Sequence, residues 1–438
     1  MNTDDTPTIL VSPQVEEVVL RQTESREARS SRISTGVLIG VVGLLLVWLA
    51  TRTEGTAHFA LSDAFNEVQL PTLQVPGLAT VATAAAVTLL AAVGFISGRL
   101  HGRMTAFAGT VAGLAVVLGF LTWAAAGREL PFPVANQFAG TIDFATPLIL
   151  GALCGVMCER SGVVNVAIEG QMLTAAFMAA IVGSMTQSIT IALVAAVIGA
   201  MVMGALLALF SIKYFVEQVV IGVVINLFAS GLTGFIFDQS IQPNSLKLNQ
   251  PPIMEKIAIP GLSKIPFFGD VLFKQTALAY MALASVVLVW FLLFRTKWGL
   301  RVRAVGEHPQ AADTVGINVA MTRWSAVLVG SVFAGLGGAF FTIGFAGAFN
   351  KDMTVGNGFI ALAALIMGRW RPGLSALMAL FFGFVTQMAS QLQTINTPMP
   401  SQFLLILPYV ATIIAVAGLV GRVRAPAADG VAYVKEGH

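Results

Sequence analysis

The sequence predicts an all-α fold, a polytopic transmembrane helical bundle of about 11–12 membrane segments that include broken or re-entrant helices. Only 11% of the 438 residues are charged and 56% are hydrophobic, whereas a soluble globular protein has about 25% charged residues. Apolar runs long enough to cross a bilayer recur along almost the whole chain. The net charge of +3 gives no support for nucleic-acid binding.

By composition the chain divides into four parts. Residues 1–33 are polar and of mixed charge, and they lack the basic start, apolar centre and small-residue cleavage site of a secretory signal. We therefore expect them to form a disordered cytoplasmic tail. Residues 34–138 hold three additional N-terminal transmembrane helices, residues 139–421 hold the main transmembrane core, and residues 422–438 form a cytoplasmic C-terminal tail.

The apolar segments follow one another closely along the chain. Those of the N-terminal part lie at 35–50, 78–96 and 105–126. In the core, the segment 358–368 is too short to span as a regular helix. Within 323–345, Gly330, Ala334 and Gly338 share one face, and small residues at this spacing predict close helix packing. The segments of the core lie at 139–157, 171–186, 188–211, 217–237, 272–294, 323–345, 358–368, 373–391 and 403–421.

The distribution of basic residues predicts the orientation. With the N-terminus inside and the segments alternating, the inner stretches hold 18 of the 25 Lys and Arg residues and the outer stretches hold 7. Lys and Arg are enriched in cytoplasmic loops. We therefore expect a multi-pass protein of the plasma (inner) membrane, with both termini in the cytoplasm and the loop 238–271 outside.

Several kinds of chemistry have no support in the sequence. The chain has no GxxxxGK[ST], HExxH or GxSxG motif and its four histidines are scattered, so we expect no catalytic residue and no ATP site in this chain. Its two cysteines, Cys154 and Cys158, lie one helical turn apart in an apolar segment. This excludes a disulfide framework and favours packing over a metal site. A transporter, a channel or a scaffold remains.

Polar residues interrupt the apolar pattern at 159–170, which reads ERSGVVNVAIEG. A charged side chain at the bilayer centre costs about 2.5–3.5 kcal/mol, so these residues cannot all face lipid. Interrupted helices often build transport sites, because half-helix ends offer unpaired N–H and C=O groups. The alternative is an ordinary cytoplasmic turn followed by a helix that begins at Asn165, and spacing leaves both open.

A second irregular region lies at 346–358, AGAFNKDMTVGNG, before the short apolar run FIALAALIMG. We expect Lys351 and Asp352 at the outer surface, and Arg369 and Arg371 at the inner surface. An interrupted segment in each half of the chain is typical of carriers with structural repeats, although no clear sequence repeat accompanies it.

The segment 299–319, GLRVRAVGEHPQAADTVGINV, is a charged cytoplasmic loop. Pro309 suits the first turn of a helix and Gly316 suits its end, so we expect a helix of about two turns between them. One side of this helix is expected to carry Ala311, Ala312 and Val315. It is either a docking element for another protein or a linker helix that rests on the membrane surface.

Four stretches carry a family resemblance. They are ERSGVVNVAIEGQMLTAAF at 159–177, VEQVVIGVVINLFASGLTGF at 216–235, the loop 299–319, and GGAFFTIGFAGAFNKDMTVGNGFIALAALIMGRWRPG at 337–373. Together they resemble permease subunits of ABC importers in the branched-chain amino acid and simple sugar group. The resemblance is closest to nucleoside permeases linked to basic-membrane-lipoprotein receptors. It covers residues 139–421, with 299–319 as the coupling loop, whereas residues 1–138 depart from it.

This resemblance implies a transport subunit without an ATPase site or cofactor of its own. ATP would bind to two ATP-binding subunits, or to one ATPase with two nucleotide-binding halves per subunit. A second homologous permease subunit and a lipoprotein substrate-binding receptor would complete the complex in membrane lipid. The helix 309–315 would enter a groove on an ATPase subunit. The residues expected to serve this coupling are Gly306, Glu307, Pro309, Ala311, Ala312 and Gly316.

The resemblance implies nucleosides as the solute. The candidate pathway residues Asn165 and Glu169 share one helix face, and Gln218 and Asn226 lie eight apart in the segment 217–237. Amide and carboxylate side chains suit ribose hydroxyls and base edges, although the same groups could instead bond only between helices. The alternatives are a simple-sugar (ribose-type) ABC permease, an ion-coupled secondary transporter with Glu169 as the titrating group, and a membrane scaffold.

Overall fold

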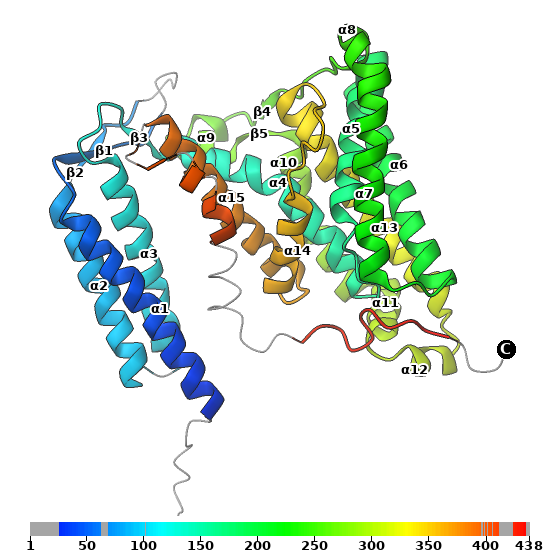
Figure 1. Cartoon of the computed structure of the whole chain (residues 1–438), viewed down its shortest axis with the longest axis horizontal. Coiled ribbons are helices and arrows are strands. Elements are labelled where there is room, and N and C mark those ends of the chain that lie inside the picture. Colours follow the sequence, from blue (N-terminus) through cyan, green and yellow to red (C-terminus); the bar gives the residue numbers. More distant parts are fainter. Residues whose placement is uncertain are drawn as a thin grey trace, which may run out of the picture.

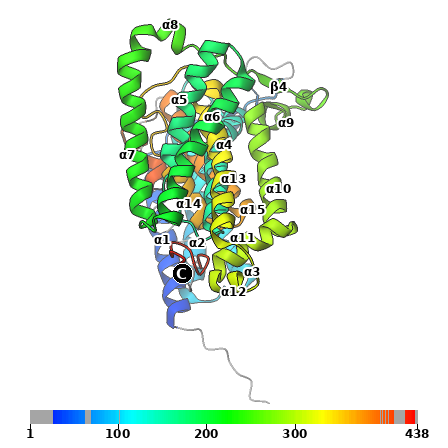
Figure 2. The same ribbon diagram turned by 90° about the vertical axis from the view of Figure 1, so that its right-hand side faces the viewer.

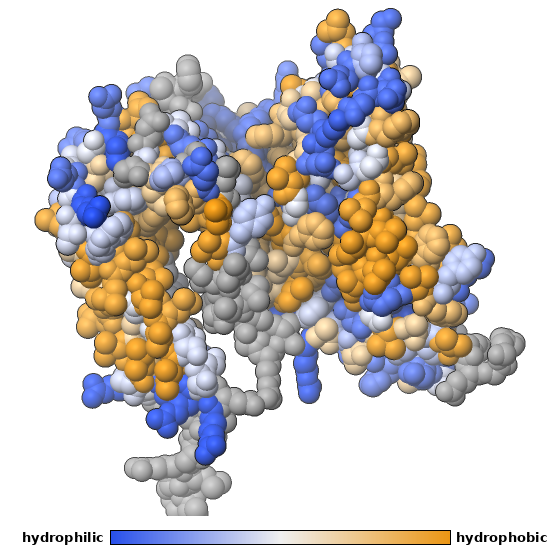
Figure 3. Space-filling model, in the orientation of Figure 1, coloured by the Kyte–Doolittle hydropathy of each residue, from blue (hydrophilic) through white to orange (hydrophobic). Residues whose placement is uncertain are grey.

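The computed structural model confirms an all-α polytopic membrane protein. Among the residues that it describes, ten helices are long and apolar enough to cross a membrane, and α14 (Asn357–Met367) is a shorter apolar helix. Figure 3 shows an apolar band between polar ends. The last predicted segment, 403–421, is described only near its start. The described residues are 26–62, 69–100, 102–395, 397, 399–400, 402–404, 406–410 and 424–434.

The N-terminal part is a three-helix unit that carries a small sheet at one end (Figure 1). In this sheet β1 is antiparallel to β2, with Thr56 opposite Pro76, and parallel to β3, with Phe59 opposite Phe132. Following the predicted orientation, we call this end of the molecule the outer end and the opposite end the inner end. The elements of the unit are α1 (Arg26–Ala50), β1 (Thr56–Ala60), β2 (Leu73–Pro76), α2 (Gly77–Ser97), α3 (Arg103–Ala125) and β3 (Phe132–Pro133).

The first helix begins earlier than the sequence pattern predicts. Residues 26–33 are helical, so the prediction that they belong to a disordered tail is wrong; residues 1–25 lie outside the described part of the chain. The Arg32 guanidinium donates hydrogen bonds to the carbonyl oxygens of Phe95 and Ile96 at the C-terminal end of α2. A basic side chain at such a helix end satisfies free carbonyl groups, which gives these polar turns a tertiary contact.

The three-helix unit packs on the core through its outer end. Phe59 of β1, Leu121 of α3 and Phe132 of β3 share one apolar cluster with Met388 and Leu392 of α15 (Pro372–Thr394). The unit is therefore attached to the core where the sheet lies (Figure 1).

The core is built around α4 (Val134–Glu159), which contacts α13, α15, α14 and α10 and has 89% of its most apolar stretch buried. The glycines of α13 allow the predicted close packing. A Cβ atom at Gly338 would lie 2.2 Å from the carbonyl oxygen of Met172, and one at Gly335 would lie 2.6 Å from the Cα of Val197. The remaining core helices are α5 (Ile168–Thr186), α6 (Ile189–Ala208), α7 (Gln218–Ile236), α10 (Ala277–Arg295) and α13 (Val319–Ala339).

Short elements lie at the two ends of the core. Three π-helical turns continue α6, α7 and α13; they are η1 (Leu209–Lys213), η2 (Phe237–Ile241) and η5 (Phe340–Ala346). At the outer end follow η3 (Gln242–Asn244), α8 (Ser245–Leu248), β4 (Lys256–Ala258), η4 (Leu262–Lys264), α9 (Phe268–Leu272) and β5 (Lys274–Thr276). At the inner end lie α11 (Lys297–Glu307) and α12 (Pro309–Thr314), seen at the lower right of Figure 1 and below α13 in Figure 2.

Candidate functional site

The chain breaks between α4 and α5. Residues 160–167 are turns and irregular chain, with Gly162 at a φ of +87°, and α5 begins only at Ile168. We call residues 160–167 the first broken segment. Ser161, Val163 and Asn165 within it are fully buried. An exposed cytoplasmic turn would not bury these residues, and a helix does not begin at Asn165. Irregular backbone at depth is tolerated where it is enclosed by protein, which is the situation here.

Helix α7 satisfies the polar groups that this break leaves free. The side-chain oxygen of Gln218 accepts a hydrogen bond of 2.7 Å from the Val164 N–H. The Asn226 side chain accepts from the Gly170 N–H at 2.8 Å and donates to the Val166 carbonyl at 3.0 Å. Buried backbone groups need such partners. Because a helix rises 1.5 Å per residue, these two residues lie about 12 Å apart along α7, and they bind both the first broken segment and the start of α5.

Glu169, in the first turn of α5 directly after the first broken segment, binds the start of α14. Its carboxylate accepts hydrogen bonds from the Thr354 hydroxyl at 2.5 Å, the Gly356 N–H at 2.9 Å and the Gly358 N–H at 2.6 Å. A helix N-terminus has free N–H groups and a positive dipole end, which favour a carboxylate. The two irregular regions, which the sequence presents separately, therefore meet at this carboxylate.

The close approach at this junction depends on a glycine. A Cβ atom at Gly358 would lie 2.5 Å from the backbone nitrogen of Glu169, so no larger residue fits there without displacing the start of α5.

Asn165 lies deeper than the other candidate residues. Its side-chain nitrogen lies 3.3 Å from the Cys154 sulfur and 3.4 Å from the Cys158 sulfur, while its oxygen has no partner. Both cysteines are free thiols and are buried. The side chains of Asn165 and Gln218 are therefore buried and bind neighbouring groups within the protein, whereas those of Glu169 and Asn226 are half-buried. The role of the four residues in solute binding stays a prediction.

Further polar residues along α7 extend this network. Ser230, one turn beyond Asn226, donates a 2.6 Å hydrogen bond to the Asp352 carboxylate. Lys351 forms a 2.6 Å ion pair with Asp238 at the start of η2. Asn357 is half-buried at the start of α14. The chain from 350 to 358 thus descends along α7 from the outer end towards Glu169. The spacing of four between Asn226 and Ser230 could have indicated this face.

The inner surface carries the predicted short helix. Pro309 begins α12 and Gly316, with a φ of +83°, follows its end, as the sequence predicts. The prediction that Ala311, Ala312 and Val315 share one side is wrong. Ala312 is 3% exposed and packs against protein, whereas Ala311 is exposed and Val315 is 75% exposed. Consecutive helix residues point about 100° apart, so Ala311 and Ala312 face different sides of α12, and Val315 follows the end of this helix.

The end of α11 contacts the first broken segment. A Cβ atom at Gly306 would lie 2.2 Å from the Arg160 carbonyl oxygen, so α11 packs directly against the backbone of the first broken segment. Burial lowers the pKa of the Arg160 guanidinium; the neighbouring Glu307 opposes this shift, while Arg303 and Arg371 add to it. The Arg160 side chain donates to the Trp370 carbonyl at 3.0 Å. The inner ends of α4, α11 and α14 are therefore tied together.

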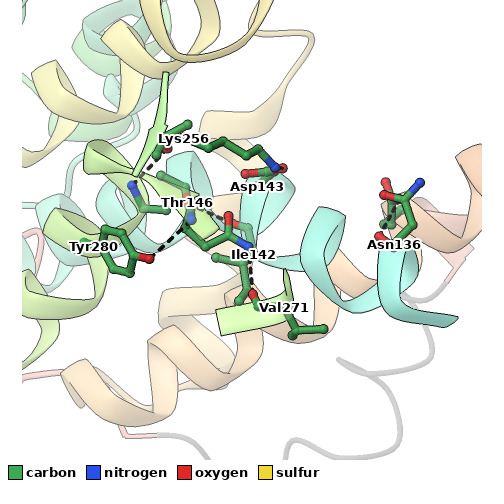
Figure 4. Close-up of polar contacts among 11 residues, drawn as sticks. Asn136, Ile142, Asp143, Thr146, Lys256, Val271 and Tyr280 are labelled. Carbon is green, nitrogen blue, oxygen red and sulfur yellow. Dashed lines mark hydrogen bonds and ion pairs between the residues drawn. The ribbon is translucent and has the colours of Figure 1, made fainter. Parts of the chain in front are cut away.

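The outer surface carries the hairpin of β4 and β5 (Figure 4). Lys256 of β4 forms a 2.9 Å ion pair with Asp143 of α4. The Tyr280 hydroxyl donates to the Ile257 carbonyl and accepts from the Gln275 N–H, both at 3.3 Å. The hairpin is thereby fixed on α4 and α10.

Among the residues that the structure describes, no group of three or more His, Cys, Asp or Glu side chains is placed so that it could hold a metal ion.

A polytopic bundle in which two broken helices meet, with a short helix displayed at its inner end, is the architecture of a transporter permease. The family described as the permease component of the branched-chain amino acid transport system matches residues 137–417, and the chain belongs to this family. It is therefore a multi-pass membrane protein, and the resemblance drawn from the four sequence stretches is confirmed. The match leaves residues 1–136 and 418–438 outside it.

Known proteins that are similar to this chain are named as permeases. The nucleoside ABC transporter permease protein NupC of Lactococcus lactis is 40% identical over 311 residues, which cover 68% of this chain and 96% of that protein. The guanosine ABC transporter permease protein NupQ of Bacillus subtilis is 40% identical over 305 residues, 67% of this chain and 95% of that protein. The putative glucose permease TsgC13 of Haloferax volcanii is 32% identical over 297 residues, 64% and 90%. No solved structure matches the chain.

Proposed function

We propose that the chain is the transmembrane permease subunit of an ATP-driven ABC importer for nucleosides. The observation that carries this proposal is the 40% identity, over two thirds of the chain, to relatives named nucleoside and guanosine permeases. Import of a simple sugar is the second candidate, because relatives named as glucose permeases are 32% and 26% identical.

The energy for transport comes from partner subunits in this proposal. The sequence has no phosphate-binding loop of the GxxxxGK[ST] type, so ATP binds to two ATP-binding subunits, or to one ATPase with two nucleotide-binding halves. Helix α12 is the docking element. It lies at the inner end of the core (Figure 1), and Ala311 in this helix and Val315 just after it are apolar and exposed. An ATP-binding subunit docked here would cover these two side chains.

A second permease subunit and a lipoprotein receptor complete the proposed complex. Two Bacillus subtilis proteins named as guanosine permeases, NupQ and NupP, are both similar to this chain, at 40% and 25% identity. This supports a pair of related permease subunits. The β4–β5 hairpin and its ion pair between Lys256 and Asp143 give the outer end a fixed surface for the receptor. Both termini lie in the cytoplasm in this arrangement.

The solute passes along α7 where the two irregular regions meet. Glu169, Asn226 and Asn357 are the half-buried polar side chains at this junction. Carboxylate and amide groups pair well with ribose hydroxyls and base edges. Asn165 and Gln218 hold the first broken segment in place beneath them.

ATP shifts the permease between two access states. A ligand can shift such an equilibrium only by its difference in affinity for the two states. Binding of ATP would close the ATP-binding subunits, and α12 would carry this closing movement to the first broken segment through the contact of Gly306 with Arg160.

Uptake into vesicles tests this function. The chain is reconstituted with its ATP-binding subunits, its second permease and its receptor, and ATP-dependent uptake of radiolabelled guanosine is measured against excess unlabelled nucleoside, ribose or glucose. Competition by nucleosides alone is the expected result. Competition by ribose or glucose alone would favour the sugar permease. Uptake by the lone chain that needs a proton gradient and ignores ATP would show an ion-coupled carrier.

A further inference from the structure

The C-terminal segment 424–434 lies between the helix pair α11–α12 and the first broken segment. It runs along the inner end of the molecule and is drawn in red in Figure 1. The Ala428 N–H donates a 2.9 Å hydrogen bond to the Gly306 carbonyl at the end of α11, and the Ala427 N–H donates to the Glu307 carboxylate at 3.3 Å. One side of the segment is therefore fixed to the helix that leads into α12.

The other side of the segment reaches the first broken segment through Arg323. This arginine, on α13, is only 2% exposed. Its guanidinium donates to the Val431 carbonyl at 3.0 Å and to the Ser161 carbonyl at 3.2 Å. One side chain thus links the C-terminal segment to the chain that carries Asn165 and Glu169.

Gly162 permits this contact. A Cβ atom there would lie 2.9 Å from the Ala428 carbonyl oxygen and 2.9 Å from a guanidinium nitrogen of Arg323. The backbone of the C-terminal segment therefore lies directly against the first broken segment, and Asp429 lies close enough to Arg323 to interact with its charge.

The segment also supports the buried face of α12. Tyr433 packs against an apolar cluster made of Val305, Ala312 and Val319. Ala312 is one of the two buried residues of α12, the other being Pro309, so a movement of α12 towards the bundle would press on Tyr433. A cavity of about 440 Å³ beside Tyr433, lined partly by Ile212 and Phe215, leaves room for such a movement.

We propose that residues 424–434 form a coupling strut, which transmits movement of α12 through Arg323 to the first broken segment. This inference rests on the proposed docking of an ATP-binding subunit at α12. The strut acts by position only: it contacts neither solute nor nucleotide. It adds a second path to the direct contact of Gly306 with Arg160. Proximity alone does not establish coupling, so the claim requires a measurement of transport per ATP hydrolysed.

The test uses the full transport complex in vesicles, with three readouts: co-purification of the ATP-binding subunits, the rate of ATP hydrolysis, and guanosine uptake. The test variant ends at Val423 and so lacks the strut. The matched control ends at Val434 and keeps every strut contact described above. We expect the test variant to assemble and to hydrolyse ATP, while uptake per ATP falls about fivefold or more relative to the control.

Two other outcomes overturn the strut. Equal uptake per ATP in the two truncated chains would show that the segment transmits nothing. Loss of the ATP-binding subunits from the test variant would place the segment in the docking surface instead. Failure of the wild-type complex to import guanosine would overturn the proposed solute, and uptake by a chain lacking residues 309–315 would overturn docking at α12, so these failures are distinguishable from failure of the strut.

A second variant covers the case in which the truncated chain does not fold. Tyr433→Ala keeps the backbone hydrogen bonds but removes the side chain that supports Ala312. Its control is Val434→Ala, because Val434 is 64% exposed. Uptake per ATP should fall in Tyr433→Ala and stay at the wild-type value in Val434→Ala, with ATP hydrolysis retained in both. Unchanged uptake in Tyr433→Ala would overturn the strut.

Discussion

The junction at Glu169 makes a prediction that can be worked out from its contacts. Replacing Glu169 by Gln keeps the shape of the side chain but removes its negative charge and turns one acceptor oxygen into a donor nitrogen. Three donors face the carboxylate in the wild-type protein: the Thr354 hydroxyl and the N–H groups of Gly356 and Gly358. An amide nitrogen facing N–H groups cannot accept from them, so at least one of these hydrogen bonds is lost.

The magnitude follows from the kind of bond. A hydrogen bond to a charged group contributes about 1.5–3 kcal/mol, and a carboxylate at a helix N-terminus adds about 0.3–1 kcal/mol. We therefore expect Glu169→Gln to weaken the attachment of α14 by about 2–4 kcal/mol. A tenfold change in an equilibrium constant corresponds to about 1.4 kcal/mol, so the fraction of molecules in which the start of α14 is detached from residue 169 rises by a factor of about 30 or more.

Amide hydrogen exchange, read by mass spectrometry on peptides that cover residues 354–358, measures this opening directly. Exchange of this region should accelerate in Glu169→Gln, while peptides from α10 keep their rates. Glu255→Gln, a change at an exposed carboxylate of the outer surface, serves as the control and should leave exchange unaltered. Equal protection of residues 354–358 in wild type and Glu169→Gln would refute the joining of the two irregular regions by this carboxylate.

Three further predictions test other parts of the molecule. A chain without residues 309–315 should still insert into the membrane but lose ATP-driven uptake in vesicles, and retained uptake would contradict docking at α12. Gly338→Ala should destabilise the protein by about 1–3 kcal/mol in thermal unfolding, because its Cβ atom would lie 2.2 Å from a carbonyl oxygen. Gly234→Ala should not, because a Cβ atom there would have no other atom within 4 Å. Equal melting temperatures of the two variants would contradict the close packing of α13. Burial raises the pKa of Asp429 from 3.8 to about 7, against the opposing effects of Arg323 and of a hydrogen bond from the Gly430 backbone. The docked C-terminal segment therefore holds the proton more tightly than the free segment does, and its attachment should weaken as the pH rises from about 4 to about 7. Limited proteolysis of the segment should thus be faster at pH 8 than at pH 6. Asp429→Asn should remove most of this difference, although the Glu159 carboxylate lies nearby. The same pH dependence in Asp429→Asn would contradict the assignment of the effect to Asp429.

The sequence predicts much of the fold because apolar length and turn chemistry are local properties. The helices α2 to α7 lie close to the predicted segments, and Pro309 and Gly316 bound α12 as expected. The start of α1 was not predicted, since residues 26–33 are polar and the contacts of Arg32 with α2 that support this helix are not visible in the sequence. The sequence also does not show which residues of α12 face the protein, because a helix of six residues has too few positions to define an apolar side.

The candidate site was predictable in its parts but not in its assembly. The residue types and their spacing indicate that 159–170 and 346–358 are interrupted. Nothing in a local pattern shows that Glu169 bonds to Gly356, 187 residues away, or that Asn226 bonds to Gly170. The contact of residues 424–434 with Arg323 could not be predicted for the same reason, because this segment is short and has no periodic pattern that would indicate a packing partner. The predicted orientation of the termini and the predicted partners stay predictions.

The most direct test of the account is uptake by vesicles that contain the permease pair and receptor, with ATP-binding subunits either present or left out. With the subunits and ATP present, guanosine should accumulate inside the vesicles against its gradient, and accumulation should stop when either is omitted. Accumulation by the permease subunits alone, or ATP hydrolysis by this chain without a partner, would contradict the claim that this chain is a transport subunit driven by ATP hydrolysis on separate ATP-binding subunits.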